Sequence, residues 1–298
     1  MGKRKIANST NINYPNAMDI SNSSDEDQRD VDEATDDNLK DEESVEIDFD
    51  FYDPKKIDFH SIKNLLNQLF SSDSELFNLS ELTDLIIEQP LVGSTVKVDG
   101  SESDPYAILT VLNMKVHKER QCMKSIVNYL LEKSKKDSRL NDLLTDLFKE
   151  NKHDVGLILS ERLINMPVQL IPPMYKMLKE EIQWAVDDNE PYEFEWYLII
   201  SKTYREVAST IDEEMNVQGK RKKKAKLEPT IFYFHAEDEI IEQNTNYQLN
   251  FKFTKQPEAV SDSRRTFTEF GIEPAMKLFL IHKSNFDKLI QDLENACK

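Results

Sequence analysis

The pattern of apolar and polar positions changes near residue 45, and from there it predicts an ordered domain. Apolar residues first alternate with acidic ones, the period-two pattern of a half-buried strand: Val45, Ile47, Phe49 and Phe51. Later stretches instead repeat apolar residues every three or four positions, which predicts amphipathic helices. These stretches are Phe59–Phe70, Leu82–Ile87, Cys122–Leu130, Leu140–Phe148, Met174–Ala185 and Phe286–Leu293.

Residues at the helix ends agree with these boundaries. Asp58 and Ser80 carry side-chain oxygens suited to capping the first two helices. The second helix must end near Pro90, because the residue before a proline disfavours the helical conformation. A later helix is predicted to begin at Pro172 or Pro173, since a first-turn proline loses no helical hydrogen bond.

Short apolar runs between the helices predict buried strands. The runs are Tyr106–Leu112, Val155–Leu159, Phe194–Tyr204, Ile231–Phe234, Leu249–Phe253 and Met276–Ile281. Helices and strands interleave along the whole region and no repeat is visible. We therefore predict one mixed α/β domain over residues 45–298, with a central mixed sheet flanked by helices.

Residues 1–44 are predicted to form a disordered acidic tail, because they contain too few large apolar side chains to offset the entropy of ordering. Between Asp19 and Asp50 there are 15 acidic and two basic residues, so this stretch carries −13 of the net charge of −18. The tail is either a solubilising arm or a docking arm for a basic partner. The docking candidates are Asp25, Glu26, Asp27, Asp36, Asp37, Asp41, Glu42 and Glu43.

Two short motifs suggest regulation and transport. Ser23 and Ser24 precede three acidic residues, the pattern of acid-directed kinases, and phosphorylation there would add negative charge.

Residues 211–229 are predicted to form a polar loop that interrupts the domain, and loops of this length are usually functional or disordered. Its basic run favours a nuclear-import signal read by importin over a solvated loop or a nucleic-acid patch. The run consists of Lys220, Arg221, Lys222, Lys223, Lys224 and Lys226.

Composition argues against several classes of protein. A net-negative chain is poorly suited to sequence-nonspecific nucleic-acid binding, which needs clustered cations, so we expect no direct nucleic-acid partner. Two cysteines are too few for a disulfide framework or a four-cysteine zinc site. No apolar run approaches the roughly 20 residues of a membrane span. We expect a soluble protein made for the cytosol or nucleus.

The sequence contains no catalytic, cofactor or metal motif. Its six glycines are too far apart for the phosphate-binding loops of nucleotide and dinucleotide sites. The five histidines are scattered, with no zinc-binding spacing, and three lie near predicted element ends, where we interpret a histidine as a solvated or capping residue. Cys122 lies on an apolar helical stripe and is predicted to be a core residue. The acidic run Glu237–Glu239 is interpreted as a solvated helix start rather than a pair of catalytic carboxylates.

Four segments, in this order, resemble the BCCIP family: Ile62–Phe70, Glu81–Glu88, Val155–Pro173 and Tyr197–Thr203. The likeness covers about residues 45 to 297. Its most specific part is the Ser160–Pro167 stretch, with the family-motif residues Ser160, Glu161, Arg162, Asn165 and Pro167.

The resemblance implies a single α/β domain similar to Gcn5-related acetyltransferases, but without known catalysis. The glycine-rich loop that holds acetyl-CoA in that class is missing here. Fungal members of the family are chaperones for a basic ribosomal protein of the large subunit. They also support nuclear export, including that of a phosphatidylinositol phosphate kinase, whereas animal members bind cell-cycle and DNA-repair proteins. The resemblance thus implies a nuclear escort chaperone that shuttles to the cytoplasm, with a regulatory adaptor as the alternative.

Overall fold

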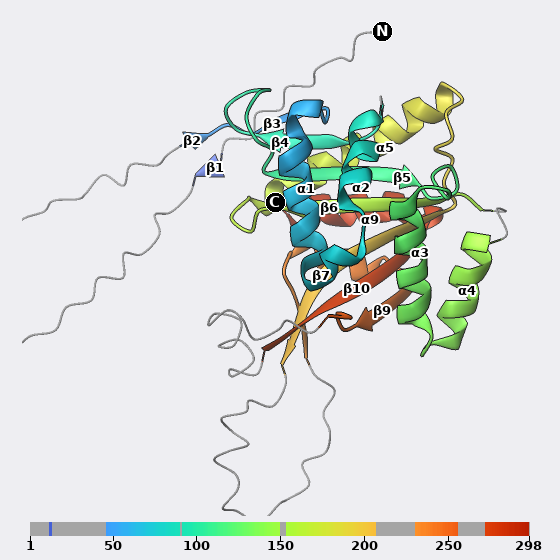
Figure 1. Ribbon diagram of the computed structural model, residues 1–298. Helices are drawn as coiled ribbons and strands as arrows, with labels where there is room; N and C mark the ends of the chain where they lie inside the picture. Colours follow the sequence, from blue (N-terminus) through green and yellow to red (C-terminus); the bar gives the residue numbers. More distant parts are fainter. Residues whose placement is uncertain are drawn as a thin grey trace, which may run out of the picture.

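The computed structural model describes residues 12–13, 46–89, 91–149, 153–206, 230–255 and 272–297. Within these residues the chain forms an eight-stranded mixed sheet flanked by helices (Figure 1). The path through the sheet is β3-β4-β5-β6-β7-β10-β9, and β8 also pairs with β7. The strands are β3 (Asp50–Tyr52), β4 (Ser94–Lys97), β5 (Ala107–Asn113), β6 (Val155–Arg162), β7 (Trp196–Glu206), β8 (Ile231–Tyr233), β9 (Tyr247–Phe251) and β10 (Ile272–His282).

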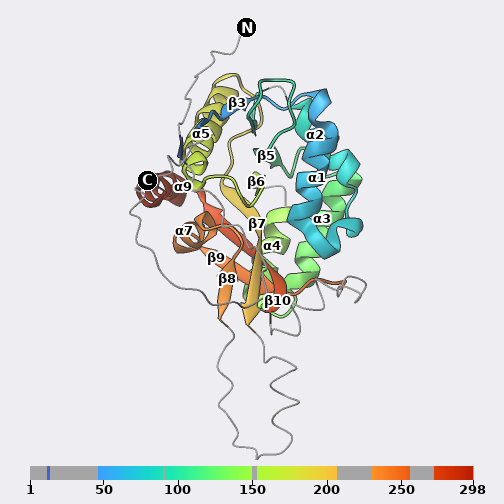
Figure 2. The same cartoon turned by 90° about the vertical axis from the view of Figure 1, so that its left-hand side faces the viewer.

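The helices cover both faces of this sheet, as Figure 2 shows. One face carries α1 (Phe59–Phe70), α2 (Leu79–Glu88), α3 (Gln121–Ser134) and α4 (Ser138–Lys149). The other face carries α5 (Ile171–Asp187), α7 (Glu237–Gln243) and α9 (Lys283–Ala296). Three short 3-10 helices join these elements: η1 (Lys56–Asp58), η2 (Ser71–Leu76) and η3 (Val168–Leu170).

A hydrophobic core lies on each face, and the strands supply both cores by simple alternation. In β10, Met276, Leu278 and Leu280 pack under α1–α4. The alternate residues Phe279 and Ile281 pack under α5 and α9. Because both faces are covered, the central strands consist of continuous apolar runs. The predicted single mixed α/β domain is therefore confirmed, and Cys122 is fully buried as predicted.

Of the two predicted helix caps, Ser80 is wrong and Asp58 is right only in its position. The cap of α2 is Asn78, whose side chain accepts a hydrogen bond from the Glu81 amide at 3.3 Å, and Ser80 lies inside the helix. Asp58 precedes α1 but its carboxylate does not cap that helix. It is 1 % exposed and pairs at 2.5 Å with the ammonium of Lys97, which is itself fully buried. The other carboxylate oxygen accepts from the Lys55 amide at 2.9 Å, so Asp58 serves tertiary structure and the start of η1 rather than the start of α1.

Strand lengths also differ from the sequence prediction. The alternating stretch that begins at Val45 forms two short strands, β2 (Glu46–Ile47) and β3, and Phe49 between them is buried. Strand β2 pairs with β1 (Ile12–Asn13), which lies inside the predicted tail. Strands β7 and β10 pair along eleven residues each, beyond the end of their apolar runs. The two strands continue to pair there because the hydrogen bonds between their main chains do not depend on the type of side chain.

The remaining tail residues of 1–44 and the loop 211–229 lie outside the described residues. The acidic docking candidates, the serines Ser23 and Ser24, and the basic run 220–226 therefore stay predictions. Among the helices that the structure describes, none is long and apolar enough to cross a membrane.

Candidate functional site

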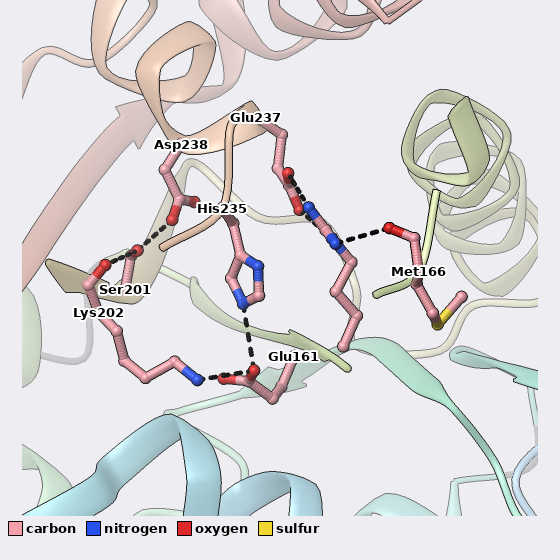
Figure 3. Close-up of polar contacts among 8 residues, drawn as sticks. Glu161, Met166, Ser201, Lys202, His235, Glu237 and Asp238 are labelled. Carbon is pink, nitrogen blue, oxygen red and sulfur yellow. Dashed lines mark hydrogen bonds and ion pairs between the residues drawn. The ribbon is translucent and has the colours of Figure 1, made fainter. Parts of the chain in front are cut away.

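The candidate site lies where the parallel strands β6 and β7 part. They pair over four residues, from Val155–Trp196 to Ile158–Ile199. Beyond this point β6 stays paired with β5 as far as Arg162, and β7 stays paired with β10. Strand β8 takes over the open edge of β7 only from Thr203. The notch between the two strands holds a cluster of polar side chains, which we call the notch cluster (Figure 3).

The members of the notch cluster come from three parts of the chain. Strand β6 supplies Glu161 and Arg162, and strand β7 supplies Ser201 and Lys202. His235 comes from the turn just before α7, and Glu237 and Asp238 are the first two residues of that helix. Each of these side chains is at most 14 % exposed, although residues of these types usually face water. Burial of so many polar groups is tolerated only when they satisfy one another.

An Arg162–Glu237 ion pair closes one side of the notch. Arg162 Nε and Nη2 each donate to a different carboxylate oxygen of Glu237 at 2.8 Å, the bidentate geometry that guanidinium favours. Arg162 Nη1 also donates to the Met166 carbonyl at 2.9 Å. One arginine thus ties α7 and the turn after β6 to the end of that strand.

The charge of Arg162 decides the protonation of Glu237. Burial alone raises the pKa of this carboxyl, but the hydrogen bonds and charge of Arg162 outweigh burial and hold the pKa below its usual value. Glu237 is therefore ionised near neutral pH.

Glu161 is the centre of the other side of the notch. Its Oε1 accepts from Lys202 Nζ at 2.8 Å and faces His235 Nε2 at 3.1 Å, and Figure 3 shows it between these two groups. Among the described residues, Glu161 Oε2 and His235 Nδ1 have no hydrogen-bond partner. Two buried polar atoms in one cluster therefore have no partner in the part of the chain that the structure describes.

Asp238 is the member of the cluster whose charge is least well compensated. Its carboxylate accepts a short hydrogen bond from the Ser201 hydroxyl. Three carboxylates, those of Glu161, Glu237 and Asp238, share only two permanently charged cations in the notch. Burial, followed by the negative charge of Glu237, raises the pKa of Asp238 to about 7. The cluster can therefore bind and release a proton near neutral pH.

The notch cluster contains a serine, a histidine and an aspartate, but not in the order of a nucleophilic relay. Such a relay needs the hydroxyl to donate to the imidazole, with the acid orienting the imidazole from behind. Here the Ser201 hydroxyl donates to Asp238, whereas the His235 imidazole faces Glu161. The arrangement is that of a structural polar cluster. No group of three or more potential metal ligands occurs among the described residues.

The structure brings together part of what the sequence suggested. Of the family-motif residues, Glu161 and Arg162 belong to the notch cluster, while Ser160 precedes them on β6 and pairs with Leu109. Asn165 is exposed in the turn after β6, and the buried Pro167 precedes η3.

The interpretation of Glu237–Glu239 as a solvated helix start is wrong for its first two residues, which are buried at 3 % and 5 % exposure. His235, at 7 % exposure, is likewise not solvated. His282 does cap α9, by accepting from the Ser284 amide. The missed signal was the charged pair Glu161–Arg162 at the end of an apolar strand, because such charges require buried partners.

Comparisons with known proteins agree with this structure. A sequence model of the BCCIP family matches residues 44–241. The chain is 47 % identical over 256 residues to protein bcp1 of Aspergillus fumigatus, covering 85 % of this chain and 88 % of the relative. It is 45 % identical over 257 residues to protein bcp1 of Schizosaccharomyces pombe, covering 85 % and 90 %.

The crystal structure of BCP1 from Saccharomyces cerevisiae is similar in fold, with a TM-score of 0.58 and 27 % identity over 88 % of this chain and 94 % of the other. The names of these relatives state no enzymatic activity. The chain belongs to the BCCIP family.

Proposed function

We propose that this protein is a non-enzymatic nuclear escort chaperone for a basic ribosomal protein of the large subunit. Family membership carries the proposal, because the family resemblance implies that role. In this role the protein covers the rRNA-binding charges of its client, releases it to the assembling ribosome and supports nuclear export of proteins.

The distribution of charge supports a basic client. The stretch between Asp19 and Asp50 carries −13, and the other 266 residues together carry only −5. A concentrated field of one sign steers an oppositely charged partner and raises the rate of association. Specificity then comes from the surface of the folded domain.

The notch cluster supports a non-enzymatic role. The strands β6 and β7 part beyond Ile158 and Ile199, and Arg162 and Glu237 close one side of the notch between them with a buried ion pair. We therefore expect acetyl-CoA to leave the melting temperature unchanged, whereas a bound ligand would raise it.

Affinity purification followed by mass spectrometry tests the client. We expect a lysine- and arginine-rich protein of the large ribosomal subunit to copurify in stoichiometric amount. Recovery of cell-cycle or DNA-repair proteins without any ribosomal protein would instead favour the regulatory adaptor.

A salt titration of the purified complex tests the tail. We expect affinity to fall with ionic strength, and deletion of residues 1–44 to reduce both the affinity and its salt dependence. A deletion variant that binds as tightly as the full chain removes the tail from the mechanism.

The basic run accounts for the proposed location of the protein, which is the nucleus with shuttling to the cytoplasm. Replacing Lys222, Lys223 and Lys224 by alanine removes three positive charges that importin would bind. We expect a fluorescent fusion of this variant to shift toward the cytoplasm. An unchanged nuclear signal would reduce the loop to a linker.

A further inference from the structure

A cavity of about 350 Å³ lies at the opposite end of β6 from the notch cluster, where α3 and α4 meet the end of β5. Figure 1 shows these two helices side by side at the edge of the sheet. The apolar part of the cavity wall has buried and half-buried members. The buried ones are Met114, Leu147 and Val155, and the half-buried ones are Val127 and Phe148. The volume falls within the range of about 300–1,000 Å³ that is usual for ligand pockets.

The rim of this cavity is basic, although the chain as a whole carries −18. Lys115, Lys118 and Lys124 line it from two segments, the β5–α3 turn and α3 itself, and His153 lines it from the segment before β6. Between Met114 and Lys124 the sequence has four lysines and arginines and one acidic residue. Lysines from two segments thus border an apolar centre.

The turn that carries two of these lysines is held in place by Asn113. This side chain is 3 % exposed, and its Oδ1 accepts from the amides of Lys115 at 2.9 Å and Val116 at 3.2 Å. Its Nδ2 donates to the Pro191 carbonyl at 2.6 Å. A rim fixed by a buried side chain costs little ordering entropy when a ligand binds.

Two of the rim lysines pair with carboxylates that are partly or largely exposed. Lys124 pairs at 2.8 Å with Glu119, whose side chain is 78 % exposed. Lys115 pairs at 3.5 Å with Asp154, which is 34 % exposed. Ion pairs this exposed contribute little to stability, so a lysine can exchange its own carboxylate for that of a ligand.

We propose that this cavity binds a peptide segment of a partner protein in which a large apolar side chain is flanked by acidic residues. The apolar side chain enters between α3 and α4, against Val127 and Phe148. Acidic residues on both sides of it pair with the cations on the different segments of the rim. This partner is opposite in charge to the proposed basic client, so the inference does not depend on that client.

Fluorescence anisotropy with a labelled five-residue peptide tests the inference. The probe has one phenylalanine between two pairs of acidic residues. The comparison peptides replace the phenylalanine by alanine, or the acids by lysines. We expect the probe to bind the full chain more weakly as salt is added. We expect the alanine peptide to bind at least about tenfold more weakly, and the lysine peptide not to bind at concentrations up to about 1 mM.

Charge reversal on the rim provides the matched protein variants. Lys118→Glu with Lys124→Glu should weaken binding of the probe at least about tenfold. Lys135→Glu with Lys136→Glu makes the same charge change in the turn after α3, outside the cavity lining, and should leave binding unchanged. Thermal melting of both variants checks that they fold. Equal binding by the two variants, equal binding of the phenylalanine and alanine peptides, or no binding of the probe would overturn the proposal.

Discussion

The Arg162–Glu237 ion pair makes a quantitative prediction about stability. Replacing Arg162 by methionine keeps much of the side-chain volume but removes the bidentate partner of Glu237. Glu237 and Asp238 would then lie at 3 % and 5 % exposure with one cation fewer in the notch. Breaking a buried ion pair by removing one partner typically costs about 3–5 kcal/mol, because the other charge stays buried and uncompensated. We expect a loss in that range for Arg162→Met.

The complementary variants separate charge from packing. Glu237→Gln keeps the shape and one acceptor oxygen, so its cost should be smaller, about 1–3 kcal/mol. Replacing Arg162 and Glu237 together by methionine removes both charges, and apolar replacements of a complete buried pair are often close to neutral. We therefore expect this double variant to be more stable than Arg162→Met alone.

Equilibrium unfolding in urea measures these differences, with the fluorescence of Trp184 and Trp196 as the signal. The midpoint and the slope are both needed, because an altered slope indicates a changed denatured or native ensemble. The reasoning fails if Arg162→Met costs less than about 1 kcal/mol, the range of an exposed ion pair. It also fails if the double variant loses the sum of the two single losses.

Three further predictions concern pH, a second buried pair and a helix cap. Folding raises the pKa of the Asp238 carboxyl from 3.8 to about 7. The contribution of this carboxyl to the free energy of unfolding is therefore present at low pH and is lost as pH rises to 7. The stability of Asp238→Asn relative to the wild type should therefore increase between pH 5 and pH 8, and a constant difference in urea unfolding would contradict the assigned pKa. Lys97→Ala should cost about 3–5 kcal/mol in the same assay, whereas Lys55→Ala, in a pair 3.8 Å apart and half-exposed, should cost at most about 1 kcal/mol. Asn78→Ala should cost about 1 kcal/mol and Ser80→Ala clearly less, and the reverse order of the two would restore Ser80 as the cap of α2.

Local periodicity predicted most of the elements because one face of each is fixed by burial. The apolar stripe from Cys122 to Leu130 appears as α3, and the run from Val155 to Leu159 appears as β6. Element ends were less predictable. Strand β6 continues to Arg162, because the β5 ladder supports the backbone beyond the last apolar residue. Periodicity carries no information about such partners.

Local pattern offered one signal for the notch cluster, the charged pair Glu161–Arg162 at the end of an apolar strand, but it did not identify the partners of that pair. Glu237 and Asp238 are acidic residues of the kind found at an exposed helix start. They are buried because Arg162 and Ser201, which are distant in the sequence, donate hydrogen bonds to them in the folded protein. The motif residues Glu161 and Arg162 were identified through family resemblance, without the buried role that the structure gives them. Tertiary partners 37 to 75 residues away along the chain decide the environment of these charges.

The position of β10 has a consequence for synthesis of the protein. This strand, residues 272–282, follows all the other described strands in the sequence but lies between β7 and β9 and supplies both cores. Until it emerges from the ribosome, the eleven-residue edge of β7 has no partner on that side and α9 has no sheet to cover. Because domains fold as units, the domain cannot complete its sheet until β10 and α9 have been made. A protein proposed to escort a client would thus itself need protection from aggregation until that point of its translation.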